Sequence, residues 1–496
     1  MKSHEALLKQ YGRIARVDDA LGVLHWDMAV MMPAGGAEAR TEQIAALRVI
    51  SHELATDPRI AEWLADLDEG GLSDWERANV RLMRRAWLHA TAVPAELVEA
   101  LSRACARCEM TWRTARKADD FKTLSPLLTE VLRLVREEAG HKAEALGVAT
   151  PYDALLDLHD PGSNQARVDA LFDPLAETLP KLIDEVIEHQ ARHRPFQVPA
   201  GPFPTEVQAA VGRRIIEAIG FDPTHGRVDI SHHPFCGGAP DDVRITTRYD
   251  AADFGSSMMG LIHETGHAMY ERGLPAKWRY QPVGRVSSMA MHESQSLLIE
   301  MQACRTPAFF EFAGPLLREA FGGSGPAWET ENLHRWQTRV ERGLIRVDAD
   351  EVTYPAHVIL RYRLEKALIG GTLEIADLPD AWAESMKALV GIAPTDNRDG
   401  VMQDIHWMDG AFGYFPTYTL GAMIAAQLFA AAVDNEPDLL AGIARGDFRP
   451  LVGWLRRNVH EWGSHDDTDA LLTRATGRPL DAAAFRRHLS RRYLDT

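Results

Sequence analysis

The sequence is poor in cysteine, with only four in 496 residues (Cys105, Cys108, Cys236 and Cys304). Four cysteines are too few for a disulfide scaffold, and their scarcity fits a protein of a reducing compartment. Cys105 and Cys108 do have C-x-x-C spacing, but they lie in a charge-rich helical stretch without a second pair. We therefore interpret this spacing as a coincidence of packing and not as a metal or redox motif.

Long hydrophobic runs are also missing. The most apolar stretch, Leu420–Val433, is shorter than the roughly 20 residues that a helix needs to cross a bilayer, and it contains Gly421 and Gln427. We expect it to be a buried core helix. The first residues, from Met1 to Glu5, open a charged amphipathic helix and lack the pattern of a signal peptide. The sequence therefore predicts a soluble, cytoplasmic protein with no membrane partner.

The sequence has fewer basic than acidic residues. The chain carries 54 Lys and Arg against 71 Asp and Glu, which gives a formal net charge of -17. A chain this acidic is a poor partner for nucleic acid or for an anionic membrane, although a local basic patch inside a cleft is compatible with it. With 46% hydrophobic residues, the chain can build one large core or two lobes around a cleft.

Strand-like patterns are confined to one region. From residue 5 to about 195, apolar residues recur at three- and four-residue spacing, which predicts helices nearly throughout. After four closely spaced prolines (Pro195 to Pro204), residues 227–231 and 242–249 alternate as strands do, with a turn-rich stretch at 233–238 between them. We expect a small antiparallel sheet here, whose edge could pair with an extended peptide. The chain beyond it is predicted to be helical again.

The residues that follow this sheet carry the clearest chemical signal. Residues 258–270 are apolar at both ends and polar in the middle, and they predict one helix that contains His263-Glu264-x-x-His267. Histidines four residues apart lie on one helical face, so two imidazole nitrogens can bind one cation. Glu264 projects about 100° away from His263, where it can reach a water molecule but is poorly placed as a ligand. This arrangement is typical of zinc peptidases that use the glutamate as a general base.

A catalytic zinc site needs a third protein ligand. A histidine six residues after His267 is excluded because Gly273 stands there, and Glu271 would place three ligands in a row along a straight helix. Ser287 or Ser288 can cap a further helix that carries His292 and Glu293 on its first turns. Adjacent helical residues point about 100° apart, so only one of this pair can face the metal, and we predict that it is Glu293.

Six short motifs, in order along the chain, identify a family. They are His233-Pro234-Phe235, Asp242-x-Arg244-x-Thr246, His263-Glu264-x-x-His267, His292-Glu293-Ser294-Gln295, Ile345-Arg346-x-x-Ala349-Asp350 and Gly400-x-x-Gln403-Asp404-x-His406-Trp407. With them the chain resembles, over essentially its full length, the thermostable carboxypeptidase Taq family of zinc metallocarboxypeptidases.

The resemblance implies a nearly all-α fold. The expected form is a large helical saddle with a deep active-site groove, related to angiotensin-converting enzyme and neurolysin. We expect a single catalytic domain over residues 1–496, with helical lobes on either side of the groove and a zinc-binding core at about 227–420. The resemblance also implies a homodimer, broad removal of C-terminal residues from peptides, and Zn²⁺ with Co²⁺ as a substitute. The family's metal ligands fall on His263, His267 and Glu293.

Further roles are hypotheses about single residues. His406 and Tyr414 are the candidates for stabilising the oxyanion, since relatives of this fold use a His and a Tyr after the zinc helices, and Tyr418 is the alternative to Tyr414. An ordinary packing role is the competing interpretation for these aromatic residues. Asp404 could accept a hydrogen bond from His406 and so orient it.

An exopeptidase must also recognise a free C-terminal carboxylate, which arginine can bind through two hydrogen bonds. Arg244 and Arg346 are the candidates, against the alternative that each forms an ordinary salt bridge. His233 and Gln403 are lesser candidates for substrate contacts. Two rival functions are another zinc peptidase on the same fold, such as a dipeptidyl carboxypeptidase or oligoendopeptidase, and a helical binding protein that has kept a zinc site without catalysis.

Overall fold

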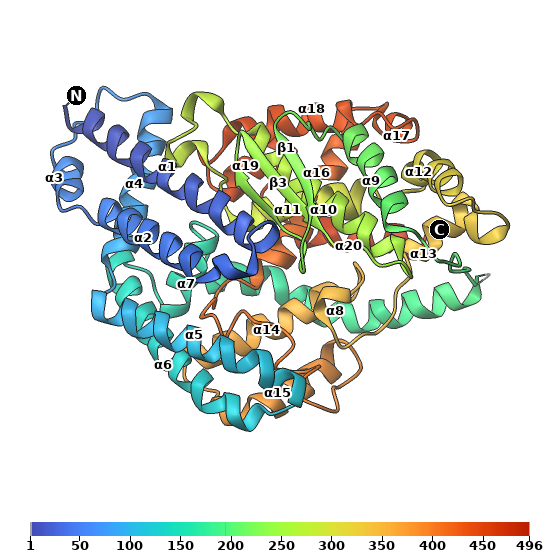
Figure 1. Ribbon diagram of the computed structural model, residues 1–496, viewed down its shortest axis with the longest axis horizontal. Helices are drawn as coiled ribbons and strands as arrows, with labels where there is room; N and C mark the ends of the chain where they lie inside the picture. Colours follow the sequence, from blue (N-terminus) through green and yellow to red (C-terminus); the bar gives the residue numbers. More distant parts are fainter. Residues whose placement is uncertain (1, 194, 496) are drawn as a thin grey trace. The chain divides into compact units, whose positions relative to one another are not determined.

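The computed structural model describes residues 2–193 and 195–495 (Figure 1). Helices dominate, as the apolar spacing predicts, and the chain divides into two compact units that are each assembled from separate stretches. The first unit holds the chain up to Trp87, Pro195–Thr338 and Ile424–Leu480. The second unit holds residues 88–193, Arg339–Met423 and the segment from Asp481 onward.

Most helices belong to the first unit. Those lying wholly or mostly within it are α1 (Lys2–Val30), α2 (Ala37–Ala55), α3 (Arg59–Ala65), α4 (Asp74–Thr91), α9 (Thr205–Ile219), α10 (Phe254–Gly273), α11 (Met289–Leu297), α12 (Pro307–Ala320), α13 (Thr330–Gln337), α17 (Leu439–Ile443), α18 (Arg449–Asn458) and α19 (Thr468–Thr476). Capping residues set several helix starts: at the start of α4 the Glu76 carboxylate accepts from Ser73 N, and the Ser73 hydroxyl accepts from Glu76 N.

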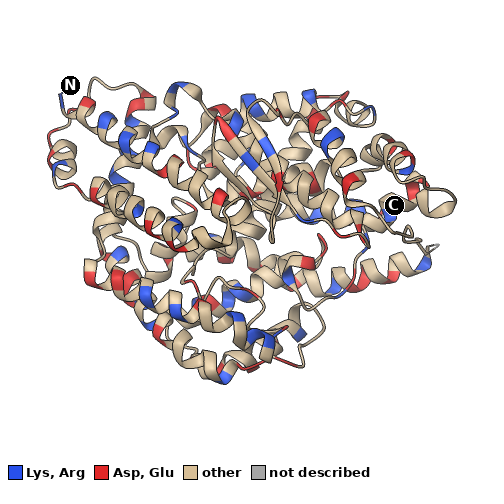
Figure 2. Cartoon of the chain, in the orientation of Figure 1, with Lys and Arg blue, Asp and Glu red and all other residues tan. Residues whose placement is uncertain are grey.

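The second unit is built from longer helices. They are α5 (Ala95–Ala118), α6 (Phe121–Leu146), α7 (Pro151–His159), α8 (Gln165–Arg192), α14 (Tyr354–Ile369), α15 (Leu378–Leu389) and α20 (Ala482–Tyr493). Helix α7 begins at Pro151, a residue favoured at the first helical position, and Thr150 caps it by accepting a hydrogen bond from Asp153 N. Figure 2 shows acidic and basic residues interspersed along the helices of both units, so the acidic excess is not gathered on one element.

Helix α16 (Pro416–Asn435) contains the most apolar stretch of the chain. It extends over 20 residues, longer than the 14-residue run that stands out in the sequence, and by length and mean hydropathy (1.3) it could cross a membrane. Its most apolar window is 78% buried inside the folded chain, however. This burial confirms the prediction of a core helix.

The only sheet among the described residues has three strands, in the order β1-β3-β2, and lies in the first unit. Strands β2 (Cys236–Ala239) and β3 (Asp242–Thr247) form an antiparallel hairpin, but β1 (Gly226–Ile230) pairs with β3 in parallel. The prediction of an antiparallel sheet is therefore wrong for this pair. Part of the turn-rich stretch forms the strand β2. Because the chain reverses between β2 and β3, β3 runs in the same direction as β1.

The sheet supports the helix that carries the two histidines. Figure 1 shows the strands lying across α10. One buried apolar cluster joins the two elements and α9; its members are Ile216, Phe221, Val243, Ile245, Leu261 and Ala268. Because Leu261 and Ala268 bracket the histidine motif, burying them fixes which face of α10 the histidines occupy.

Cys105 and Cys108 lie on α5 as free, buried cysteines. Burial raises the pKa of each thiol to about 12. A thiol with so high a pKa is a poor metal ligand and a poor nucleophile at neutral pH. The structure thus agrees with the interpretation of this C-x-x-C spacing as a coincidence of packing.

Candidate metal centre

Helix α10 carries two histidines whose imidazole rings lie next to each other. Asp253 caps the helix by accepting hydrogen bonds from Gly255 N (2.8 Å) and Ser256 N (3.4 Å). Nearly three and four turns later, His263 and His267 point the same way, with ring centroids 5.0 Å apart and ring planes at 82°. The four-residue spacing therefore places both rings at one site, as the sequence predicts.

Helix α11 approaches α10 closely at a glycine. A Cβ on Gly266 would lie 2.5 Å from both Gln295 O and Ser296 Cα of α11, so no larger residue fits between the two backbones. Gly266 stands directly before His267, and the close approach brings α11 alongside the histidines. Gly266 is not among the residues predicted from the sequence, although a glycine in mid-helix is a signal of close packing.

Ser288 begins α11, its hydroxyl accepting a hydrogen bond from Met291 N (3.0 Å) as the sequence predicts. Glu293 on the next turn points at the two histidines: its Oε2 lies 4.0 Å from His263 Nε2 and 3.6 Å from His267 Nε2. One ligand atom from each of the three residues falls within 4.8 Å of the others. Two ligands of a tetrahedral zinc ion are about 3.4 Å apart, so this triangle is slightly wider than a bound ion requires.

His292 turns away from this triangle. Its ring stacks on that of His267, with centroids 4.3 Å apart, and its Nε2 lies 3.2 Å from Glu271 Oε1. The structure thus brings together His263, His267 and Glu293, and it separates His292 and Glu271 from them as a second pair.

In both His263 and His267, Nδ1, the far nitrogen that points away from Glu293, already has a hydrogen-bond partner. His267 Nδ1 lies 3.1 Å from His292 O, and a carbonyl can only accept, so this nitrogen carries the proton. His263 Nδ1 lies 3.0 Å from Glu300 Oε2, whose other oxygen accepts from Arg305 NH2 at 2.7 Å. In both rings Nε2 is left to act as a ligand, which is the arrangement found behind metal-binding histidines.

Glu300 lies on a π-helix, Leu298–Ala303, that continues α11. It stands seven residues after Glu293, about two helical turns along, so both carboxylates face His263. Glu293 lies on the Nε2 side of the ring and Glu300 on the Nδ1 side. Glu300 and Arg305 are not among the site residues predicted from the sequence. A signal was available, because a glutamate within Leu297-Leu298-Ile299-Glu300-Met301 is buried (6% exposed) and needs a partner.

The charges of the site favour a cation. Burial acts to lower the pKa of His263, but the hydrogen bond to Glu300 and the charge of Glu293 raise it to about 10. A proton thus occupies this ring when no other cation does. The pKa of His267, by contrast, is held well below its usual value, first by burial and then by the charges of His292 and His263. The donor set of two histidines and one carboxylate, with bonded far nitrogens, fits a catalytic divalent metal.

Glu264 lies beside the triangle on α10 and is 6% exposed. Burial raises its pKa to about 7, and the charge of Glu293 adds to this effect while that of His263 opposes it. A carboxylate with such a pKa can both take and release a proton near neutrality, which is what a general base requires.

Arg244 and His233 also lie in the first unit. Arg244, on β3, forms two hydrogen bonds to Asp242 (3.0 and 2.6 Å), and its guanidinium stacks on the Trp26 ring at 4.3 Å. Its charge is therefore matched by one carboxylate. His233 is exposed in the connection between β1 and β2, with its ring against that of His232.

The second unit gathers another group of predicted residues. His406 Nε2 lies 3.2 Å from the Tyr418 hydroxyl, and the rings of His406 and Tyr414 have centroids 5.9 Å apart. Burial lowers the pKa of His406 to about 4, so the ring is neutral at pH 7. Its Nδ1 is buried without a hydrogen-bond partner among the described residues, which leaves it open to a ligand.

Asp404 pairs with arginines and not with His406. Its Oδ1 accepts from Arg346 NH2 at 2.8 Å, and its Oδ2 accepts from Arg361 Nε at 2.8 Å. The hypothesis that Asp404 orients His406 through a hydrogen bond is therefore wrong, because both carboxylate oxygens face guanidinium groups. Burial alone would raise the pKa of Asp404, but the charges of Arg361 and Arg346 hold it well below its usual value.

Gln403 braces the same segment. Its Oε1 accepts from Arg346 N (2.8 Å), and its Nε2 donates to Leu344 O (3.0 Å) and Asp399 O (2.8 Å). These bonds tie the start of the 3-10 helix Arg346–Asp348 to the turn before Asp404. They give Gln403 a bracing role, which the sequence alone does not distinguish from contact with substrate.

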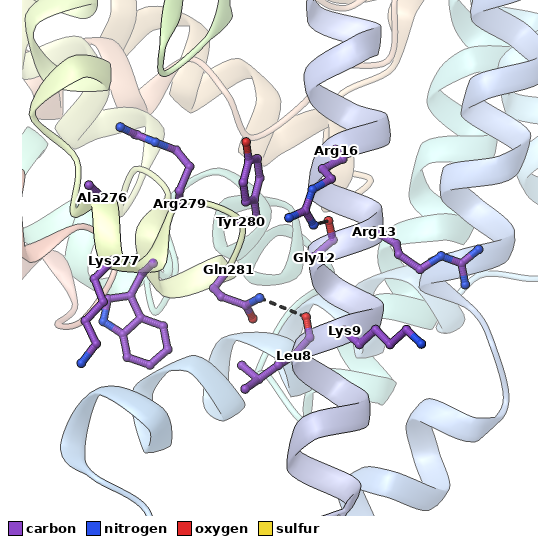
Figure 3. Close-up of a pocket in the computed structure, with 11 residues that line it drawn as sticks. Leu8, Lys9, Gly12, Arg13, Arg16, Ala276, Lys277, Arg279, Tyr280 and Gln281 are labelled. Atoms are coloured by element: carbon purple, nitrogen blue, oxygen red, sulfur yellow. Dashed lines mark hydrogen bonds between the residues drawn. The ribbon is translucent and has the colours of Figure 1, made fainter.

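A cavity of about 490 Å³ in the first unit is lined by none of the candidate residues described above (Figure 3). It lies between α1 and the residues that follow α10, and its walls include Lys9, Arg13, Arg16, Lys277 and Arg279. Figure 3 shows Arg16 pointing to Tyr280, while Lys9 and Arg13 point away from that side. No carboxylate or histidine lines it, so we do not place the chemistry there.

Comparisons with known proteins agree with this site. Residues 6–493 match the family described as carboxypeptidase Taq (M32) metallopeptidase. The chain is 40% identical over 491 residues to thermostable carboxypeptidase 1 of Thermus thermophilus (96% of this chain and 95% of that protein). It is 34% identical over 493 residues to thermostable carboxypeptidase 1 of Pyrococcus furiosus, with 98% of each covered. The solved structure of Trypanosoma cruzi metallocarboxypeptidase 1 superposes with a TM-score of 0.97 at 40% identity, covering 100% of both chains.

Proposed function

Because the chain belongs to the carboxypeptidase Taq (M32) family of metallopeptidases, we propose that it removes C-terminal residues from peptides, with broad specificity and with zinc as its metal. The observation that carries this proposal is the convergence of His263, His267 and Glu293 within 4.8 Å, with Glu264 beside them. Zinc suits two imidazoles and one carboxylate, and Co²⁺ accepts the same donors.

Glu264 acts as the general base. A divalent cation at the site supplies Lewis acidity: it polarises the scissile carbonyl and makes a water molecule easier to deprotonate. Glu264 takes the proton from the attacking water and passes it to the leaving amine. Its pKa of about 7, set mainly by burial, allows both transfers near neutral pH. Glu300 holds His263 through Nδ1 so that Nε2 keeps its direction.

His406 and Tyr414 stabilise the negative charge that develops on the carbonyl oxygen. Both aromatic rings lie in one cluster with Tyr418, and the low pKa of His406 keeps its ring neutral. Tyr418 already has His406 Nε2 as a partner for its hydroxyl. Tyr414 is therefore proposed as the oxyanion donor for its place in the ring cluster, and Tyr418 as the residue that orients His406.

Arg346 binds the C-terminal carboxylate of the substrate. Arg346 and Arg361 share one directly paired carboxylate, Asp404, so Arg346 has no carboxylate to itself. Arg244, by comparison, is matched one to one by Asp242. A substrate carboxylate would give Arg346 an ion-pair partner of its own, whereas Arg244 already has one, and this supports Arg346 over Arg244.

Peptide products test the proposal. A peptide with a free C-terminus and the same peptide with a C-terminal amide are incubated with the enzyme and followed by mass spectrometry. We expect single residues to leave only from the free-acid peptide, activity to stop with a chelator, and Zn²⁺ or Co²⁺ to restore it. Release of dipeptides or internal cleavage would instead assign a dipeptidyl carboxypeptidase or an oligoendopeptidase.

The family resemblance also supports a homodimer in the cytoplasm as part of this proposal. Sedimentation analysis of the purified enzyme is expected to give twice the mass of one 55.1 kDa chain. A single-chain mass would exclude the dimer without affecting the peptidase assignment.

A further inference from the structure

Glu365 is a fully buried carboxylate (0% exposed) that no step described so far uses. Its Oε1 accepts a hydrogen bond from Trp407 Nε1 (2.7 Å), and its Oε2 accepts from Gly413 N (2.9 Å) and from the Tyr152 hydroxyl (2.7 Å). Trp407 directly follows His406, and Gly413 directly precedes Tyr414. One carboxylate thus bonds both ends of the segment that separates these two residues.

We propose that Glu365 is a positioning residue, which clamps Trp407 to Gly413 and thereby sets the geometry of His406 relative to Tyr414. This inference rests on the proposed function of His406 and Tyr414, and it adds a residue that reaches neither of them directly. All residues involved lie in the second unit.

The segment between Trp407 and Gly413 contains no helix or strand and consists mostly of hydrogen-bonded turns. Its two ends meet through the stacked rings of Trp407 and Phe412, whose centroids are 6.0 Å apart with an angle of 7° between planes. Gly413 has a φ of +82°, and a Cβ there would lie 2.8 Å from Leu155 C. The end before Tyr414 therefore tolerates no side chain, and its backbone N–H is free to meet the carboxylate.

Helix α14 supplies the fixed side of the clamp. Arg361 and Glu365 are four residues apart on one buried face, and both are 0% exposed. Arg361 holds Asp404, two residues before His406, while Glu365 holds the residues on either side of the turns. The segment is thus attached to one rigid helix at three points.

Only an ionised carboxylate satisfies all three donors at once. An indole N–H, a backbone N–H and a phenol O–H point at its two oxygens, so an acceptor is needed at each. Burial raises the pKa of Glu365 to about 7, and the bonds from Tyr152, Trp407 and Gly413 oppose this rise. A glutamine in the same place would keep one acceptor oxygen and turn an N–H₂ group toward a donor.

The test compares Glu365→Gln with Glu351→Gln. Glu351 is a matched control, since it is a buried carboxylate of the same unit that also accepts from a tyrosine hydroxyl, that of Tyr493 (2.9 Å). Each metal-loaded variant is assayed for kcat and KM on a free-acid peptide, for bound metal, and for hydrogen–deuterium exchange of residues 405–415. A third variant, Glu365→Gln with Trp407→Phe, removes the indole N–H that would face the new amide.

We expect Glu365→Gln to lower kcat by about 10- to 100-fold with KM within about threefold, because a small misplacement of reacting groups costs rate more than binding. Bound metal stays at the wild-type level, and exchange at 405–415 accelerates. The added Trp407→Phe change restores kcat to within about threefold of Trp407→Phe alone. Glu351→Gln leaves kcat and the exchange of 405–415 unchanged.

Unchanged exchange at 405–415 in Glu365→Gln would overturn the clamp itself. Accelerated exchange with unchanged kcat would overturn the positioning role, leaving Glu365 as a purely structural residue. The single variants Tyr414→Phe and His406→Gln separate this result from failure of the proposed function: if they lower kcat, the catalytic roles stand and only the positioning role of Glu365 fails.

Discussion

His263 Nδ1 lies 3.0 Å from Glu300 Oε2, while Nε2 of the same ring faces Glu293 Oε2 at 4.0 Å. Two glutamates, seven residues apart on one helical run, thus act on opposite nitrogens of one imidazole. Glu293 faces Nε2, where the candidate metal ion would bind, and Glu300 fixes the orientation of the ring through Nδ1. Arg305 completes the chain of contacts by donating to Glu300 at 2.7 Å.

Replacing Glu300 with Gln is expected to weaken metal affinity by about 10- to 100-fold, because the carboxylate no longer orients His263 or increases its basicity. Competition with a chromophoric chelator measures this affinity. Glu319→Gln, on the exposed face of α12, is the control and should bind metal as the wild type does. An unchanged affinity in Glu300→Gln would remove Glu300 from the support of the site.

Replacing Tyr414 with Phe is expected to lower kcat by a factor of roughly ten to a thousand, because the oxyanion loses a hydroxyl donor. KM and bound metal should change little. The matched variant Tyr418→Phe should have the smaller effect, since the Tyr418 hydroxyl is bonded to His406 Nε2. Equal kcat in wild type and Tyr414→Phe eliminates Tyr414 as the donor.

Replacing Arg346 with Ala is expected to raise KM for free-acid peptides about 10- to 100-fold more than for C-terminally amidated ones, the effect of losing a charge-assisted bond. Arg361 keeps Asp404 neutralised in this variant, so the unit should still fold. Arg244→Ala is the comparison and should affect both peptides alike. The role moves to Arg244 if that variant, and not Arg346→Ala, discriminates between them.

Much of the structure around His263, His267 and Glu293 can be predicted from local sequence rules. The apolar flanks of residues 258–270 predict the histidine helix, and Ser288 begins the next helix. The 100° between adjacent helical residues allows only one of His292 and Glu293 to face the histidines. Capping and helical spacing act within a few residues, so one sequence contains the information. The same holds for the start of α7 at Pro151.

Other features depend on partners far along the chain. The strand Cys236–Ala239 has the sequence CGGA, which carries little strand propensity and forms only because β3 pairs with it. Asp404 meets Arg346, 58 residues away, and Glu365 meets Trp407, 42 residues away. Local spacing cannot reveal such pairs. This is why the sequence led us to pair Asp404 with the nearby His406.

Glu351 offers a test of stability and pH. It accepts from His488 Nε2 (2.7 Å), Arg492 NH1 (2.9 Å) and the Tyr493 hydroxyl, so it fastens α20 to the second unit. Burial opposes ionisation, but the charges of Arg492 and His488 hold the pKa of Glu351 well below its usual value. Its contribution to stability is therefore complete above the unfolded-state pKa of about 4.3 and declines as the pH falls below it.

The Glu351→Gln variant is accordingly expected to lower the midpoint of thermal unfolding by about 5 °C at pH 7. The difference in unfolding midpoint between the variant and the wild type should become smaller when thermal unfolding is measured below about pH 4. A gap that stays constant or widens on acidification would contradict the depressed pKa.

The most direct measurement concerns Glu264. Glu264→Gln keeps the shape of the residue and leaves His263, His267 and Glu293 in place, but it cannot accept a proton. Turnover of a free-acid peptide is measured together with metal content by atomic emission. The account predicts one metal ion per chain, as in the wild type, with kcat lowered by about 10² to 10⁴. Near-normal turnover by a variant that still holds its metal would contradict it.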